Sequence, residues 1–345
     1  MTTTVRSPVV LMYHGVPRGC GPTHPVAPWE NTQPLKAKVF EQHISFLERN
    51  CTFIRPEEYA TARGSLRRPV ALLTFDDGFR NNAEVVVPIL KRHNIPAVFF
   101  ISSRHCAPGK YLWPNYLQML ETYFPGDGVT LNGEFIPLQG TQRRPGIKEL
   151  KDGLVALKPH PNAIYTAIDA QLPPLESFMS AALRADECEG MTVEQVQSLA
   201  ADPLFTVGAH TIDHPYLTRC EPQEAERQMY ENKSWLESLT GKRCDLLAYP
   251  LGDFNSKTVE ACRHVGFQQA FGVEREGLLP AQFAIRRVGI YSNSLVPLGI
   301  KLWFGHRLPI RLVEKVHTVA QASGMLFGSG NNRFAAKTRG YSDRF

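Results

Sequence analysis

Short apolar segments alternate with helical segments along much of this chain. Val9–Tyr13, Val70–Phe75 and Ala97–Ile101 are almost wholly apolar, and turn residues bound each of them. Strands that are buried on both faces have such continuous apolar runs, which are typical of parallel sheets covered by helices. The pattern therefore predicts an α/β fold built on a parallel sheet.

The alternation of apolar and helical segments is interrupted between about residue 107 and residue 190. The elements expected there are a helix at 113–124, a hairpin that turns at Asn132-Gly133, and helices at 146–157 and 161–170. We interpret 107–190 as an inserted α+β segment, either a lid or a subdomain that recognises the substrate, because added loops often set specificity in barrel enzymes. Residues 1–295 are then expected to form one domain that contains this insertion.

Residues 296–345 are expected to form a basic amphipathic helix, at about 308–322, and a polar tail. The chain of 345 residues has a net charge of +5, and the charged residues of 301–345 account for all of this excess. The rest of the chain therefore has no global attraction for nucleic acid, and we expect no nucleic-acid partner. Two interpretations of the tail stay open: peripheral contact with an anionic membrane, or packing on the main domain with the basic side in water.

Composition also suggests where the chain works. None of the seven cysteines forms a CxxC pair, and the first residues lack the pattern of a secretory signal. No apolar run approaches the ~20 residues needed to span a bilayer. We therefore expect a cytoplasmic protein, membrane-associated if the tail binds lipid.

Two adjacent carboxylates, Asp76 and Asp77, directly follow the apolar segment that ends at Phe75. Like charges at the end of a buried strand repel each other, so such a pair needs compensation, which a metal ion commonly provides. Gly78 lets the backbone turn sharply after the pair. The alternative is an ordinary turn between a strand and a helix, with an aspartate as the helix cap.

A second candidate is the segment His210-Thr211-Ile212-Asp213-His214. In a helical turn, residues i and i+4 face the same way, so both imidazoles would reach one ion. Two neutral histidines and one carboxylate are a typical set of catalytic zinc ligands, with a fourth position left for water. The alternative is two unrelated histidines in a loop.

The ordered set of segments resembles the NodB-homology polysaccharide deacetylases, also called carbohydrate esterase family four. TFDDG at 74–78 and HTIDH at 210–214 resemble the first two motifs of that family, and PVVLMYHGV at 8–16 resembles an opening strand of its bacterial members. The resemblance covers roughly residues 7–105 and 191–292. It implies a distorted (β/α) barrel and the metal-dependent N-deacetylation of amino sugars.

The resemblance also assigns roles at the two motifs. It makes Asp77, His210 and His214 the metal ligands and Asp76 the general base. Zinc is the metal that this ligand set suits first, and cobalt, nickel, manganese and iron are alternatives. A divalent metal lowers the pKa of bound water and polarises a carbonyl, which is what hydrolysis of an acetamide requires.

Further residues receive supporting roles from the same resemblance. A backbone N–H near the third motif, at Tyr249, Pro250 or Leu251, is expected to hold the oxyanion of the tetrahedral intermediate. Thr211 and Asp213 are expected to orient the histidine loop.

The chain departs from the family pattern at two positions. The aligned third motif, Leu247–Gly252, lacks the arginine that contacts the catalytic aspartate in many members. After residue 280 the only histidines are His306 and His317, and neither lies in the Leu-x-His context of the usual proton donor. His14 ends the first strand, so it is a candidate catalytic side chain on the same rim as Asp76. Its alternative role is that of a histidine bonded to the backbone.

These observations predict a metal-dependent hydrolase that removes an N-acetyl or other N-acyl group from an amino sugar or glycan, in cell-surface polysaccharide metabolism. Two alternatives stay open. One is a deformylase or amidase acting on a lipid-linked or small non-polymeric substrate. The other is a non-catalytic, glycan-binding relative, because two motif residues are absent.

Overall fold

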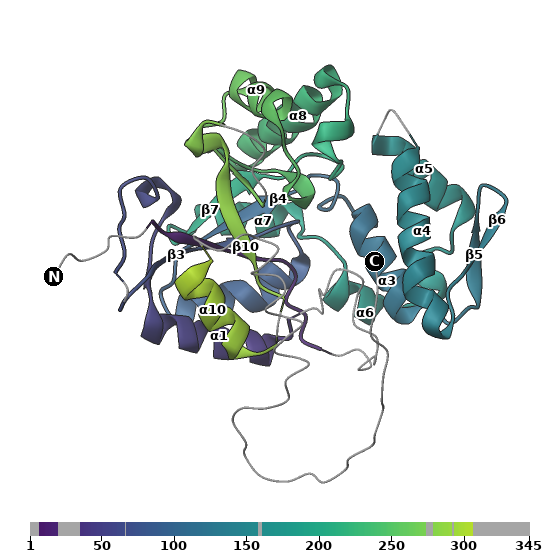
Figure 1. Cartoon of the computed structure of the whole chain (residues 1–345), viewed down its shortest axis with the longest axis horizontal. Helices are drawn as coiled ribbons and strands as arrows, with labels where there is room; N and C mark the ends of the chain where they lie inside the picture. The colour runs from purple at the N-terminus through teal and green to yellow at the C-terminus, as the bar shows by residue number, and fades with distance from the viewer. Residues whose placement is uncertain are drawn as a thin grey trace, which may run out of the picture.

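Seven parallel strands form a closed barrel in this protein. The computed structural model describes residues 7–19, 35–65, 67–157, 161–273, 279–291 and 293–305 (Figure 1). In sheet order the barrel strands are β1 (Val9–Tyr13), β10 (Ile285–Gly289), β9 (Gln269–Gly272), β8 (Leu246–Ala248), β7 (Phe205–Ala209), β4 (Ala97–Ile101) and β3 (Val70–Phe75). Pairing of β1 with both β10 and β3 closes the barrel, and the short β2 (Thr52–Phe53) joins the start of β3. The predicted distorted (β/α) barrel is thereby confirmed.

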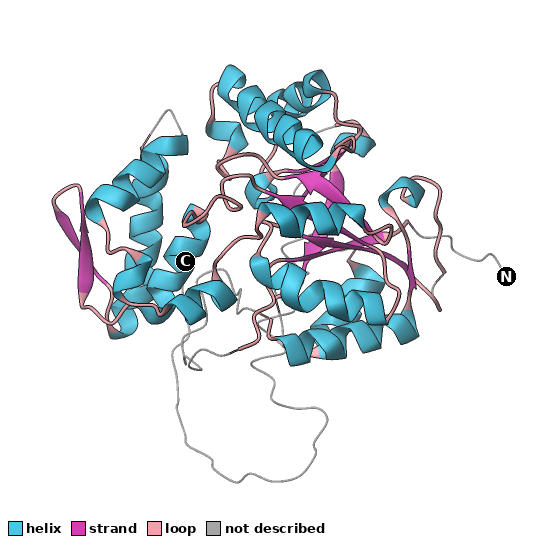
Figure 2. Cartoon of the chain, turned by 180° about the vertical axis from the view of Figure 1, so that it is seen from behind, coloured by secondary structure: helices cyan, strands magenta, loops and turns pink. Residues whose placement is uncertain are grey.

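Helices surround these strands, as Figure 2 shows. They are α1 (Ala37–Asn50), α2 (Val87–Arg92), α7 (Val193–Ala201), α8 (Pro222–Thr240), α9 (Ser256–Val265) and α10 (Leu295–Phe304). Their limits follow from local chemistry: Pro222 opens α8, and Gly241 ends it at a φ of 66°. The larger core lies between strands and helices, and a smaller one, which includes Val10, Leu72 and Phe100, fills the barrel.

The segment between β4 and β7 has a hydrophobic core of its own. It contains α3 (Trp113–Tyr123), β5 (Gly128–Leu131), β6 (Glu134–Pro137), α4 (Arg143–Ala156), α5 (Pro161–Gln171) and α6 (Ala181–Glu187). The predicted hairpin is confirmed: β5 and β6 are antiparallel, and Asn132 and Gly133 between them have φ values of 53° and 85°. We call residues 113–188, which supply this core, the inserted subdomain. Tyr216 and Leu251 of the barrel pack against its core.

The sequence did not predict the helices α6 and α10. Leu298 and Leu302 of α10 belong to the barrel core and the helix packs on α1, so the packed body continues beyond residue 295. The helix predicted at 308–322 lies outside the described residues. Within the described ranges, no helix is long and apolar enough to cross a membrane.

Candidate metal centre and catalytic carboxylates

The turn after β3 sets the direction of both carboxylates. Asp76 still belongs to the strand ladder, because its N–H donates to the carbonyl of Tyr13 at 3.0 Å. Asp77 and Gly78 then adopt φ values of 74° and 80°, in the left-handed region. A Cβ at Gly78 would lie 2.9 Å from the Cγ2 of Ile101, so a glycine is required there. Asp77 has a positive φ although it has a side chain. This backbone conformation is strained, and strained residues cluster at functional sites.

The two histidines lie in a loop that follows β7, and the predicted helical turn at 210–214 is wrong. Thr211 and His214 have φ values of 66° and 53°, which no α-helix allows. The hydroxyl of Thr211 accepts a hydrogen bond from the N–H of His214 at 3.2 Å and so closes the loop. The ring centroids of His210 and His214 are 4.9 Å apart. The loop therefore brings both imidazoles together without a helix.

Asp77, His210 and His214 form one compact group of donor atoms. The Oδ1 of Asp77 lies 3.4 Å from the Nε2 of His210 and 3.4 Å from the Nε2 of His214. All three side chains are buried, and this Oδ1 has no hydrogen-bond partner among the described residues. Ligands held at about 2.0–2.1 Å in a tetrahedron lie about 3.3–3.4 Å from one another. The three residues thus fit a tetrahedral divalent metal.

The protonation of both imidazoles suits metal binding. The Nδ1 of His210 lies 2.8 Å from the carbonyl oxygen of Ala248. A carbonyl can only accept, so this nitrogen carries a proton, and Nε2, which lies 3.4 Å from Asp77 Oδ1, is the ring atom left to bind a metal. Burial lowers the pKa of His214 to about 4, against the opposing effect of the Asp77 charge, so this imidazole is neutral at neutral pH.

Asp76 is held by an arginine that the sequence analysis missed. The Nη1 and Nη2 of Arg287 donate to the two carboxylate oxygens of Asp76 at 2.6 and 2.7 Å. Burial alone would raise the pKa of Asp76, but the charge and hydrogen bonds of Arg287, with the nearby His210, lower it below its ordinary value. Asp76 is therefore ionised at neutral pH and fixed in orientation.

Arg287 comes from β10, opposite Val10 of β1, and not from the third motif. The strand segment Ile285–Gly289 offered one signal: it carries two adjacent arginines, so the alternation of side chains along a strand places one of them, Arg287, inside the barrel. Within the barrel, the Arg287 guanidinium lies 5.5 Å from the ring centroid of Phe100.

His14 lies at the rim beside the carboxylates. Its charge, when protonated, would lower the pKa of both Asp76 and Asp77. Its ring packs on Tyr291 with centroids 5.7 Å apart, and its backbone carbonyl accepts from Asn82 at 3.0 Å. The imidazole is partly exposed, and no hydrogen bond joins it to a backbone group of the described residues.

The three residues of the third motif, Tyr249–Leu251, differ in whether a backbone N–H is available to a substrate. The N–H of Tyr249 already donates to the carbonyl of Phe271 at 2.9 Å, and the Tyr249 ring is fully buried. Pro250 is buried and has no N–H. Leu251 stands in the left-handed region, with φ 59° and ψ 7°. Of the three, only Leu251 retains a backbone N–H that could face an oxyanion.

Asp213 braces the histidine loop from the barrel side. Its carboxylate accepts from Gln228 Nε2 at 2.7 Å and lies 3.3 Å from Arg104 Nη1. Its own N–H donates to Gln228 Oε1 at 2.9 Å. Both groups of Asp213 tie the middle of the loop to neighbouring elements, whereas the Thr211 hydroxyl described above makes its bond within the loop.

A protein family and a curated relative match much of this chain in sequence. Residues 63–122 and 158–270, half of the chain, match the family described as polysaccharide deacetylase. The Bacillus subtilis (strain 168) protein YxkH, described by name as a polysaccharide deacetylase, is 19% identical over 269 residues, which are 77% of this chain. The chain spans only 64% of the length of that relative.

Two of the solved structures that resemble this chain cover most of its length. One is the Streptococcus pyogenes deacetylase PplD in complex with acetate, at 17% identity and a TM-score of 0.48, covering 84% of this chain and 94% of that chain. The other is IcaB from Ammonifex degensii, at 19% identity and a TM-score of 0.49, covering 82% of this chain and 91% of that chain. The family match over half of its length shows that this chain belongs to the polysaccharide deacetylase family.

Proposed function

We propose that this protein is a metal-dependent hydrolase that removes an N-acetyl or related N-acyl group from an amino sugar or glycan. The observation that carries the proposal is the group of Asp77, His210 and His214, in which the Asp77 Oδ1 lies 3.4 Å from the Nε2 of each histidine, beside an ion-paired Asp76. Zinc is the proposed metal, and cobalt, nickel, manganese and iron are the alternatives that the ligand set also suits. A divalent metal bound in this position would polarise the acyl carbonyl of the substrate and lower the pKa of a water molecule.

Residues of the protein accept the proton of the water, stabilise the oxyanion and protonate the leaving group. Asp76 accepts the proton of the attacking water at a carboxylate oxygen, and Arg287 keeps that carboxylate ionised and aimed. The Leu251 N–H stabilises the oxyanion of the tetrahedral intermediate. The imidazole of His14, on the same rim, protonates the leaving amine, which supplies the proton donor that the family's Leu-x-His motif provides elsewhere.

The substrate is proposed to be a glycan of cell-surface polysaccharide metabolism, which the family match supports. A deformylase or amidase acting on a lipid-linked or small substrate would use the same residues. A non-catalytic glycan-binding protein is disfavoured, because the buried Asp76–Arg287 pair maintains a base that binding alone does not need.

Measuring acetate and formate released from N-acylated sugars, their oligomers and lipid-linked sugars tests the proposal. We expect release that is abolished by a chelator, restored by zinc, and lost in Asp76→Asn, which still binds metal. Formate release without acetate release would favour the deformylase. Metal and glycan binding with no release from any substrate would contradict the hydrolase and favour the binding protein.

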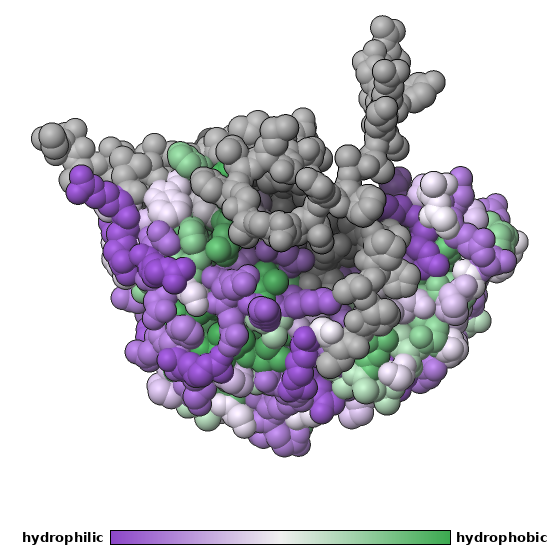
Figure 3. All heavy atoms as spheres, turned by 90° about the horizontal axis from the view of Figure 1, so that it is seen from below, coloured by the Kyte–Doolittle hydropathy of each residue, from purple (hydrophilic) through white to green (hydrophobic). Residues whose placement is uncertain are grey.

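We also propose a cytoplasmic location with peripheral contact to anionic membranes through residues 301–345, as the tail's charge suggests. The described end of the chain offers some support. Val296 and Phe304 are 56% and 47% exposed, beside an apolar groove of about 390 Å³ between α10 and Phe46. Figure 3 views the molecule from the side of α1 and α10, where apolar and hydrophilic side chains are interspersed. Absence of co-sedimentation with vesicles rich in anionic lipid would contradict the membrane contact.

A further inference from the structure

We propose that the inserted subdomain holds the metal-binding loop in shape, and that Trp113 and Tyr165 are positioning residues for the ligand His214. This inference rests on the proposed metal site and assigns the insertion a role beyond covering the substrate. The contacts that carry it join the two successive carbonyl groups of Asp213 and His214 to side chains of the insertion.

Both carbonyls accept a hydrogen bond from a buried side chain of the inserted subdomain. The indole Nε1 of Trp113 donates to the carbonyl of His214 at 3.0 Å. The hydroxyl of Tyr165 donates to the carbonyl of Asp213 at 2.9 Å and accepts from the N–H of Trp113 at 3.3 Å. Trp113 is 0% exposed and Tyr165 2% exposed, so water does not compete for these bonds. The two peptide planes that flank the Cα of His214 are thereby fixed.

His214 depends on its backbone more than His210 does. The ring of His210 is oriented by its own Nδ1 bond to the carbonyl of Ala248. The Nδ1 of His214 has no hydrogen-bond partner among the described residues. Its backbone has a φ of 53°, which a residue with a side chain adopts at some cost. The direction of the His214 side chain is therefore set by the peptide groups that Trp113 and Tyr165 hold.

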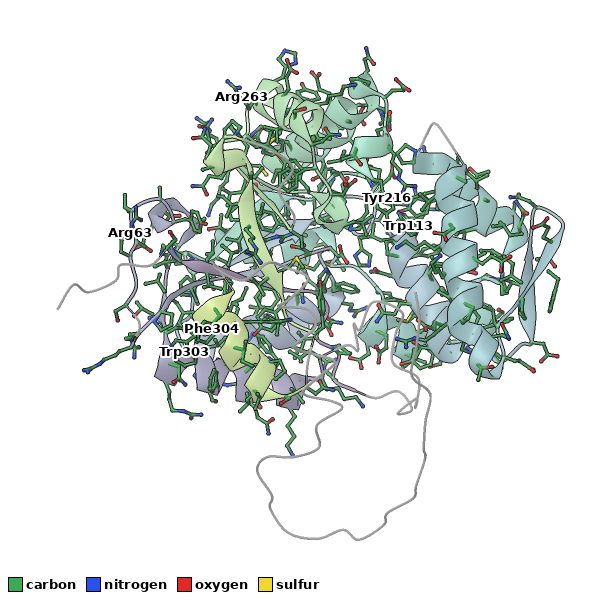
Figure 4. All side chains as sticks on the ribbon, viewed as in Figure 1. Arg63, Trp113, Tyr216, Arg263, Trp303 and Phe304 are labelled. Atoms are coloured by element: carbon green, nitrogen blue, oxygen red, sulfur yellow. The ribbon has the colours of Figure 1, made fainter. Side chains whose placement is uncertain are left out.

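An arginine of the barrel also contacts Tyr165 and the histidine loop. The guanidinium carbon of Arg104, just after β4, lies 3.4 Å from the ring centroid of Tyr165, and its Nη1 lies 3.3 Å from Asp213 Oδ1. The Trp113 ring packs on Tyr216 with centroids 6.0 Å apart, and Figure 4 shows the two rings where the subdomain meets the barrel. Stacking and hydrogen bonding together join the histidine loop to the inserted subdomain. Removing these contacts should therefore lower the metal affinity of the proposed site.

Trp113→Phe and Tyr165→Phe remove the two donors and keep aromatic packing. Groups that orient metal ligands are typically worth about 10–100-fold in metal affinity, and we expect the low end, about 10-fold, because these bonds act through the backbone. The control is Tyr116→Phe, a buried tyrosine of the same subdomain whose hydroxyl donates to the carbonyl of Pro173 at 2.8 Å, away from the loop. Metal-free full-length proteins would be titrated with zinc against a competing chelator.

Cobalt-loaded protein gives a second readout that a loss of stability alone would not change. We expect the visible spectrum of Co²⁺ to shift in Trp113→Phe and Tyr165→Phe, because His214 moves relative to the other ligands, and to stay unchanged in Tyr116→Phe. Melting curves of the metal-free proteins would show that all variants fold. If Trp113→Phe fails to fold, Tyr165→Phe alone decides.

Zinc affinities within twofold of the Tyr116→Phe control, with unchanged cobalt spectra, would overturn the inference while leaving the proposed hydrolase intact. A wild-type protein that binds neither zinc nor cobalt would overturn the inference and the proposed metal-dependent function together.

Discussion

Replacing Arg287 by lysine tests the ion pair that we assign to the catalytic carboxylate. The side chains of Arg287 and Asp76 are 0% and 3% exposed, and two hydrogen bonds of 2.6 and 2.7 Å join them. A lysine keeps the positive charge but cannot make two parallel bonds to one carboxylate. Arg287→Lys therefore removes one charge-assisted hydrogen bond and leaves the net charge of the barrel interior unchanged.

The size of the effect follows from that one bond. A hydrogen bond to a charged group is worth about 1.5–3 kcal/mol, and about 1.4 kcal/mol corresponds to one pKa unit. Arg287 favours the ionised form, so weakening its contact raises the pKa of Asp76. The acid limb of the pH profile of kcat/KM should therefore move upward by about one pH unit or more, since protonated Asp76 cannot act as a base.

The assay is the rate of acetate release across pH with the metal kept saturating. Arg286→Lys is the matched control, because the neighbouring residue of β10 faces the other side of the strand. Arg287→Gln removes the charge as well and leaves a buried carboxylate unpaired, so its free energy of unfolding should fall by about 3–5 kcal/mol. An acid limb of Arg287→Lys that coincides with those of the wild type and Arg286→Lys would refute the role given to the ion pair.

Three further predictions follow from named contacts. Removing metal with a chelator should lower the Tm, and adding zinc back should restore it by mass action, whereas Asp77→Asn should show a much smaller response to zinc in the same melting curves. Gly78→Ala should lower the free energy of unfolding by more than about 1 kcal/mol and reduce activity, because φ is 80° there and the added Cβ would lie 2.9 Å from Ile101; normal stability in urea unfolding would contradict this. Burial raises the pKa of Glu187 from 4.5 to about 7, helped by Asp186 and opposed by Tyr123 and Lys36. Because the folded state binds this proton more tightly than the unfolded chain, the stability that it contributes is full below about pH 4.5 and is lost as pH rises through about 7, by about 3 kcal/mol at most. Glu187→Gln should flatten this dependence, and an unchanged pH profile of unfolding would count against it.

The barrel could be predicted from sequence because its strands are buried on both faces and therefore apolar. The same holds for the hairpin at Asn132-Gly133, where two residues with positive φ satisfy the turn chemistry directly. Helix α10 escaped prediction because Pro297 and Gly299 interrupt its pattern. Its packing on α1 and a cap by the Ser294 side chain, which accepts from the N–H of Val296, support the helix. Local rules succeed where the local sequence determines the conformation.

The histidine loop shows why identical spacing can arise from different backbones. An i,i+4 pair faces one way in a helical turn, and the sequence offered no sign against that interpretation. The structure reaches the same result with left-handed residues at Thr211 and His214, which propensity disfavours for residues with side chains. The contacts to the carbonyl groups on both sides of the His214 Cα come from Trp113 and Tyr165, about 100 and 50 residues away in sequence. Spacing could therefore indicate the proposed ligands but not the backbone that presents them.

Adjacent buried carboxylates are tolerated here because each has its own cationic or polar partners. Asp76 completes the strand ladder and meets Arg287 inside the barrel, whereas Asp77 turns away and meets the two histidines. The left-handed turn at Asp77 creates this separation, and closure of the barrel through β1 and β10 supplies Arg287. The two carboxylates therefore point in different directions, which suits the metal-binding role proposed for Asp77 and the proton-accepting role proposed for Asp76. These proposed roles require the ion pair as much as the metal ligands, which is why we include Arg287, a buried arginine of the late strand β10, in the proposed active site.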